Sequence, residues 1–74
     1  MREQPPNPVN GSLAARRKRK GLTQHQLAER IGVSRPLLSG IESGRLIPRL
    51  THVKRIAEVL EVTPRTILGD LGLL

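Results

Sequence analysis

The sequence predicts an all-α domain of five short helices, and three observations predict it. Glycines stand at intervals that end helices, capping residues precede apolar residues, and apolar residues recur at the helical spacing i, i+3, i+4, i+7. No segment shows the alternation of apolar and polar residues that is typical of a strand. At 74 residues the chain has room for one small domain.

The amino-terminal boundary is indicated by proline. Three of the six prolines lie within residues 1–8, a composition that predicts a flexible arm. The first helix is expected from about Asn10 to Lys20, because Gly21 follows as a residue suited to a left-handed helix end. The folded domain is therefore expected over residues 9–74.

The second helix has the clearest start in the chain. Thr23 is its candidate N-cap, and Gln26 stands three residues later, which is the spacing of a capping box. Leu22 and Leu27 have the spacing of a hydrophobic staple across the same helix start. The helix is expected to end at about Ile31, before a glycine.

The remaining helices follow the same pattern. The third is expected from its cap Ser34 to about Ser43, and the fourth over about residues 50–60. The fifth begins after the cap Thr63, with Pro64 at the favoured first helical position. In the fourth helix, one buried face is predicted by Val53, Ile56, Ala57 and Leu60.

The composition excludes several classes of function. Thirteen Lys and Arg stand against six Asp and Glu, for a net charge of +7, and there is no Cys and no aromatic residue. Without Cys, and with only His25 and His52, neither a disulfide scaffold nor a usual zinc site is expected, and no metal or cofactor is predicted. The charge indicates a polyanionic partner, DNA first. An RNA- or ribosome-associated factor fits the charge but lacks the aromatic side chains on which bases stack.

The positive charge is concentrated in the run from Arg16 to Lys20. This run is expected to be either a solvated basic face that complements the helix dipole or a surface that contacts phosphates. The sequence has no Gly-rich phosphate loop, carboxylate pair or nucleophile–base set, so no enzyme is predicted and no small-molecule ligand is evident. It has no signal peptide or membrane-spanning run, so a cytoplasmic protein without a membrane partner is expected.

The second and third helices are separated only by Gly32–Val33–Ser34. A turn this short holds two helices at a steep angle, as in the helix-turn-helix of DNA-binding proteins. In that arrangement the second helix enters the major groove, and the first directs its N-terminal amides at a phosphate. The sequence therefore predicts that double-stranded DNA is the partner.

A set of short motifs occurs in order along residues 22–68. They are LTQxxLA at 22–28, Gly32–Val33–Ser34, Ile41–Glu42–Ser43–Gly44, Pro48, Ile56–Ala57 and Leu60–x–Val62. In these motifs the chain resembles the Cro/C1-type (XRE-type) helix-turn-helix family, which includes the phage lambda-type repressors. The resemblance implies a lambda-repressor-like DNA-binding domain that acts as a sequence-specific transcriptional regulator. A repressor is expected, since repression requires only occupancy of an operator that overlaps a promoter.

The resemblance also implies roles for individual residues. Positions that face the bases are matched by Arg35, Pro36, Ser39 and Gly40, and Leu37 is expected to point outward, toward a thymine methyl. Phosphate contacts are expected from Gln24, Ser43, Arg45 and Arg49, and from the hydroxyls of the caps Thr23 and Ser34. Arg17 and Glu42 match a structural ion pair. Because Pro36 and Gly40 offer no side-chain hydrogen bonds, Arg35 is the one expected bidentate reader, of guanine O6 and N7, and DNA shape is expected to contribute.

Apolar residues outside the expected core leave two interpretations open. They are Leu46, Ile47, Leu68, Leu71, Leu73 and Leu74. They form either the interface of a homodimer, at least on DNA, or the underside of the monomer's own core. An alternative function also stays open, in which the chain is an antitoxin that neutralises a protein toxin and regulates its own synthesis through DNA binding.

Overall fold

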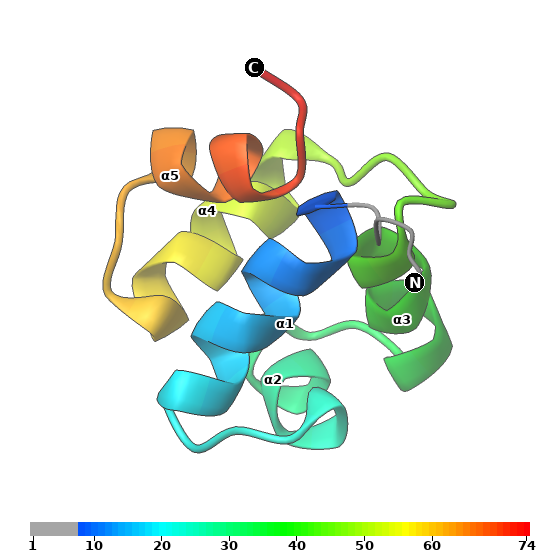
Figure 1. Ribbon diagram of the computed structural model, residues 1–74. Helices are drawn as coiled ribbons and strands as arrows, with labels where there is room; N and C mark the ends of the chain where they lie inside the picture. Colours follow the sequence, from blue (N-terminus) through cyan, green and yellow to red (C-terminus); the bar gives the residue numbers. More distant parts are fainter. Residues whose placement is uncertain (1–7) are drawn as a thin grey trace, which may run out of the picture.

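The computed structural model describes residues 8–74, and side chains from Leu13 onward. Over this part of the chain it contains five α-helices and no strand, so the predicted all-α fold is confirmed (Figure 1). The helices are α1 (Pro8–Arg19), α2 (Gln24–Ile31), α3 (Arg35–Ser43), α4 (Leu50–Leu60) and α5 (Pro64–Asp70).

The first helix begins two residues earlier than the sequence predicts. Pro8 was assigned to the flexible arm, but it is the first residue of α1. Proline fits that position because its missing N–H would have no acceptor within the helix. Residues 1–7 of the predicted arm lie outside the described part of the chain.

Local side-chain contacts determine where three helices begin. The Oγ1 of Thr23 accepts from Gln26 N at 3.0 Å, and the Oε1 of Gln26 accepts from Thr23 N at 2.9 Å, so the capping box at α2 is present. Ser34 and Thr63 cap α3 and α5 through the same kind of bond to a backbone N–H. Because a cap satisfies amides that the helix itself leaves unpaired, these starts are set by residues three positions apart.

The fourth helix has no side-chain cap at its start and no glycine at its end. Arg49 at its N-cap makes no side-chain capping bond, and Glu61 at its C-cap adopts the left-handed conformation with φ +61°. Such a conformation is uncommon for a residue with a Cβ atom, and a glycine usually takes it. The end of α4 is nevertheless closed by backbone bonds, because the N–H of Glu61 returns to Glu58 O at 3.2 Å and that of Val62 to Ala57 O at 3.0 Å.

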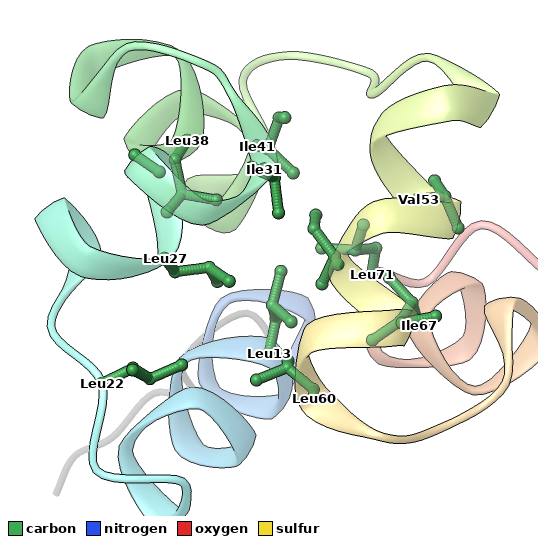
Figure 2. Packing of buried hydrophobic residues seen from close by; sticks show 13 residues of the cluster. Leu13, Leu22, Leu27, Ile31, Leu38, Ile41, Val53, Leu60, Ile67 and Leu71 are labelled. Atoms are coloured by element: carbon green, nitrogen blue, oxygen red, sulfur yellow. The ribbon is translucent and has the colours of Figure 1, made fainter.

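The helices enclose one aliphatic core. Helix α1 packs between α3 and α5, and α2 packs on both α3 and α4 (Figure 1). Figure 2 shows Leu13 of α1 in the middle of the cluster, between side chains of α2 and α4. The buried members are Leu13, Leu22, Leu27, Ala28, Ile31, Leu38, Ile41, Val53, Ile56, Ala57, Leu60, Ile67 and Leu71.

The end of the chain folds back onto this core. Leu71 is only 4% exposed, and its N–H donates to the carbonyl of Ile67 at 3.0 Å. Leu68 is half-buried and packs against the same cluster. Leu71 is therefore a core residue of the single chain, which is the second of the two interpretations that the sequence leaves open for it. In residues 8–74, no helix has the length and apolar character needed to cross a membrane.

Candidate nucleic-acid interface

The turn between α2 and α3 is held from two directions. Gly32 takes φ +77°, and the N–H of Val33 returns to the carbonyl of Ala28 at 3.0 Å. From α4, the Nη1 of Arg55 donates to the carbonyl of Ile31 at 3.1 Å. The last turn of α2 and the start of α3 are thus fixed to the body of the domain. The contact of Arg55 has no signal in the sequence, because its acceptor is a backbone atom 24 residues away.

The outer face of α3 presents polar groups from its first two turns. Arg35, the first residue of the helix, is exposed and makes no ion pair with any residue of the described range. Ser39 lies one turn further along the same face and is half-buried. Pro36 is exposed in the first turn, where its missing N–H costs no hydrogen bond.

Gly40, which was predicted to face the bases, is covered. It is buried beneath Leu46, and its carbonyl accepts the N–H groups of Arg45 and Leu46 at 2.9 and 3.1 Å. Leu37 packs against the core with part of its side chain and is half-buried, as Ser39 is. The outward contact of Leu37 with a thymine methyl therefore stays a prediction.

A buried carboxylate connects the first three helices. The Nε of Arg17 lies 2.8 Å from Oε2 of Glu42, its Nη2 lies 3.2 Å from Oε1, and both side chains are almost fully buried. The Nη1 of Arg17 also donates to the carbonyl of Leu22 at 2.8 Å. The Nε2 of Gln24, at the start of α2, donates to Oε1 of Glu42 at 3.0 Å. This network holds the Gln24 amide in place, and the second hydrogen on Nε2 is left to reach a phosphate oxygen.

A pocket of about 270 Å³ opens beside this network. It brings together residues of α1, α2 and α3, namely Ala14, Arg17, Gln24, Ser39, Glu42 and Ser43. Gln24, a candidate phosphate contact, and Ser39, a candidate base contact, therefore line one concave surface. That surface includes one flank of α1 as well as the two helices of the helix-turn-helix.

The candidate hydroxyl contacts differ in what they already bind. The oxygens of Thr23 and Ser34 accept backbone N–H groups, which leaves each hydroxyl hydrogen able to donate to a phosphate. The hydroxyl of Ser43 donates to the carbonyl of Gly40 at 3.1 Å and accepts from Nε of Arg45 at 3.0 Å. Ser43 must therefore rotate before it contacts a phosphate. Arg45 is exposed beside it, and Arg49 is exposed at the start of α4.

Three cations of the basic run each pair with a carboxylate that is distant in the sequence. Arg16 pairs with Asp70 of α5, with Nε 2.5 Å from Oδ2 and Nη2 3.2 Å from Oδ1. Lys20 pairs with Glu61 after α4, and the buried pair of Arg17 has been described above. The pair of Arg17 with Glu42 is the one that the sequence predicts. Arg16 and Lys20 were predicted to lie on a solvated basic face or a phosphate surface, but they bind carboxylates of the same chain.

In two of these ion pairs the pKa of one partner is shifted. The hydrogen bond to Asp70 raises the pKa of Arg16 above its ordinary value. The hydrogen bond from Lys20, with its positive charge, lowers the pKa of the Glu61 carboxyl from its ordinary value. Both shifts favour the charged forms of the groups, and so preserve the ion pairs.

Five large apolar side chains of the described residues are exposed, namely Leu46, Ile47, Leu50, Leu73 and Leu74. Three of them, Leu46, Ile47 and Leu73, line one pocket of about 110 Å³ between the α3–α4 loop and the end of the chain, and we define the apolar patch by these three residues. Ile47 is the most exposed of them, at 82%. All three are interface candidates in the sequence, as is Leu74, whereas Leu50 is not.

Comparison with known proteins identifies the arrangement. A helix-turn-helix family model matches residues 13–67. An uncharacterized HTH-type transcriptional regulator of Methanothermobacter thermautotrophicus is 50% identical over 44 residues, which cover 60% of this chain and 64% of that protein. The immunity repressor protein of Bacillus phage phi105 is 37% identical over 62 residues, which cover 84% of this chain and 43% of that protein.

A third relative, an uncharacterized HTH-type transcriptional regulator of Sinorhizobium fredii, is 36% identical over 55 residues, covering 74% of this chain and 71% of that protein. The chain thus spans less than two thirds of the length of the first two relatives, at 64% and 43%. No solved structure matches it significantly. The family match covers most of the chain, from within α1 to within α5, and the chain belongs to the Cro/C1-type helix-turn-helix family.

Proposed function

We propose that this chain is a sequence-specific, double-stranded DNA-binding transcriptional regulator, and that it acts as a repressor. One observation carries the proposal. The exposed Arg35 and the half-buried Ser39 share one face of α3, and Ser39 lines the same pocket as Gln24 at the start of α2. A groove-binding helix and a phosphate-binding helix end therefore face the same side. The relatives named as transcriptional regulators and as an immunity repressor support the proposal.

In the proposed complex, α3 lies in the major groove. Arg35 donates two hydrogen bonds to O6 and N7 of a guanine, and Ser39 lies close enough to the groove to contact a neighbouring base edge. Gln24 and the N-terminal amides of α2 bind a phosphate and set the register of the helix. Because Pro36 lacks a donor and Gly40 is covered, direct readout rests on few groups, and DNA shape supplies the rest of the specificity.

The test begins with selection of preferred sequences from a random duplex library. Arg35→Ala should relax the preference at one base pair by about 5- to 150-fold, the discrimination of one good bidentate contact. Gln24→Ala is the matched control, because it should weaken binding to all duplexes alike. Selection of no sequence by the wild type, or unchanged preference in Arg35→Ala, would contradict the proposal. Circular dichroism of each variant checks that the helices are intact.

Repression is tested separately from binding. A selected site is placed across a promoter, and transcription by purified polymerase is measured as the protein is added. We expect transcript yield to fall in parallel with site occupancy, since occupancy alone blocks the promoter. A rise in yield would show an activator.

We propose further that two copies bind together on DNA through the apolar patch. Its exposed aliphatic residues lie together at the α3–α4 loop and the chain end, where a second copy would remove them from water. Ile47→Ser should reduce affinity for a duplex with two half-sites and leave affinity for a single half-site unchanged. The single half-site is the internal control. An equal effect on both duplexes would exclude this interface.

A further inference from the structure

The five cations of the run from Arg16 to Lys20 lie on different sides of α1. Helix α1 packs against α3 on one flank and α5 on the other (Figure 1). Arg16 and Lys20 bind Asp70 and Glu61, on the flank that faces α5 and the end of α4. These two cations are therefore neutralised, and they lie away from the surface assigned to DNA.

Lys18 lies on the opposite flank. It follows Ala14 by one helical turn, and Ala14 lines the pocket shared with Gln24 and Ser39. A helical side chain leans toward the N-terminus of its helix and covers the preceding turn. A Lys18 side chain with this usual orientation extends past Ala14 toward the rim of the pocket, although Lys18 is not itself one of the residues that line it.

Lys18 is also the cation of the run that lies near the pocket and is not held by a carboxylate of the described residues. It is exposed, and it forms no ion pair with any residue from 13 to 74. Arg17 lies closer to the pocket, but its guanidinium is buried against Glu42. Arg19 is equally exposed, but it follows Ala15 by one turn, and Ala15 is itself exposed to solvent on the side away from the core.

We infer that Lys18 is a phosphate contact that extends the DNA-binding surface from α2 and α3 onto α1. The inference rests on the proposed function and deepens it. A phosphate held by Gln24 and the start of α2 lies at the rim of the pocket, and the flexible, compact charge of Lys18 reaches that phosphate or its neighbour from the α1 side. Of the five adjacent cations, this one alone contributes a local contact to DNA.

The experiment compares two variants that remove the same charge from adjacent positions. Wild type, Lys18→Gln and Arg19→Gln are titrated onto a fluorescent 20-base-pair duplex of mixed sequence at about 50 to 200 mM salt. A phosphate contact releases counterions, so Lys18→Gln should reduce the magnitude of the negative slope of log affinity against log salt by about 0.9. Its loss of affinity should be about 3.5-fold larger at the lowest salt concentration than at the highest. Arg19→Gln should keep the slope of the wild type, and Lys18→Arg should restore it.

The outcomes separate the inference from the function on which it rests. Slopes that are equal for Lys18→Gln and wild type, or lowered equally by both neutral variants, would overturn the contact while DNA binding stands. A wild type that binds no duplex would overturn the proposed function and the inference together. Thermal unfolding of both variants should match that of the wild type, because neither side chain has a partner in the described part of the chain. A lower midpoint only in Lys18→Gln would assign the residue a structural role.

Discussion

Leu46 occupies the space in which any other residue at position 40 would place its Cβ. A Cβ built on Gly40 would stand 2.5 Å from Cδ1 and 2.8 Å from Cγ of Leu46, which is closer than side-chain atoms pack. With any larger residue at position 40, the Leu46 side chain would have to move before the loop could pack on the helix as it does. Gly40 thus permits this close contact although glycine weakens a helix by its own propensity.

The contact between Gly40 and Leu46 predicts that Gly40→Ala lowers the free energy of unfolding in the wild-type background and raises it once Leu46 is shortened. Gly40→Ala alone should lower the free energy of unfolding by about 1 kcal/mol, since overpacking outweighs the gain in helix propensity. In a Leu46→Ala background, only the Cβ of residue 46 stays near, at 3.5 Å. There Gly40→Ala should raise the free energy of unfolding by about 0.5–1 kcal/mol. Urea denaturation of the four proteins measures both values, and the same sign in both backgrounds would disprove the steric explanation.

The buried pair of Arg17 and Glu42 predicts that removing one charge lowers stability strongly and that removing the second charge restores part of the loss. Arg17→Met leaves the carboxylate buried without its cation, at a cost of about 3–5 kcal/mol. Arg17→Met combined with Glu42→Leu removes both charges and should be more stable than the single variant. Urea denaturation measures the difference. A double variant less stable than Arg17→Met would show that the bond between Gln24 and Glu42 matters more than the uncompensated charge.

The left-handed conformation of Glu61 predicts a difference between two substitutions that both remove its carboxylate. Glu61→Gly should be more stable than Glu61→Ala by about 1 kcal/mol, because only alanine retains the clash of Cβ with the backbone at φ +61°. Both variants lose the ion pair with Lys20, so that loss cancels in the comparison. Thermal and urea unfolding of the pair measure the difference, and equal stabilities would indicate that α4 ends in another conformation.

The same carboxyl predicts a dependence of stability on pH. The pKa of Glu61 is lowered by Lys20 from its ordinary value of 4.5, so the folded state binds this proton less readily than the unfolded state. The stability that it contributes is therefore present above pH 4.5 and is lost as the pH falls through the lowered value in the folded state. Wild type should have a higher urea midpoint than Glu61→Gln at neutral pH, and the two midpoints should converge in acid. Because the group is exposed, about 1 M salt should also reduce the difference, and a constant difference across pH would contradict the ion pair.

Tertiary structure corrected the sequence-based predictions where distant residues meet. The Arg17–Glu42 pair was expected from family resemblance, but the pairings of Arg16 and Lys20 were not, because they join residues 54 and 41 positions apart. Gly40 matched a position that faces DNA in the family, and only the path of the loop showed that Leu46 covers it. In the same way, Leu71 is a core residue because the C-terminal turn of α5 packs its side chain against the core.

The sequence by itself determined the five helices, three of their capped starts and the short turn that places Arg35 at the start of the third helix. Each of these features depends on residues within about two helical turns of one another, so local pattern is sufficient to reveal them. Only the tertiary structure decided how the charge of +7 is distributed. Three cations of the basic run bind carboxylates brought to them by chain folding, and among the described residues Lys18 and Arg19 have no such partner. Net charge is a property of composition, whereas a binding surface depends on which charges the fold leaves without a partner.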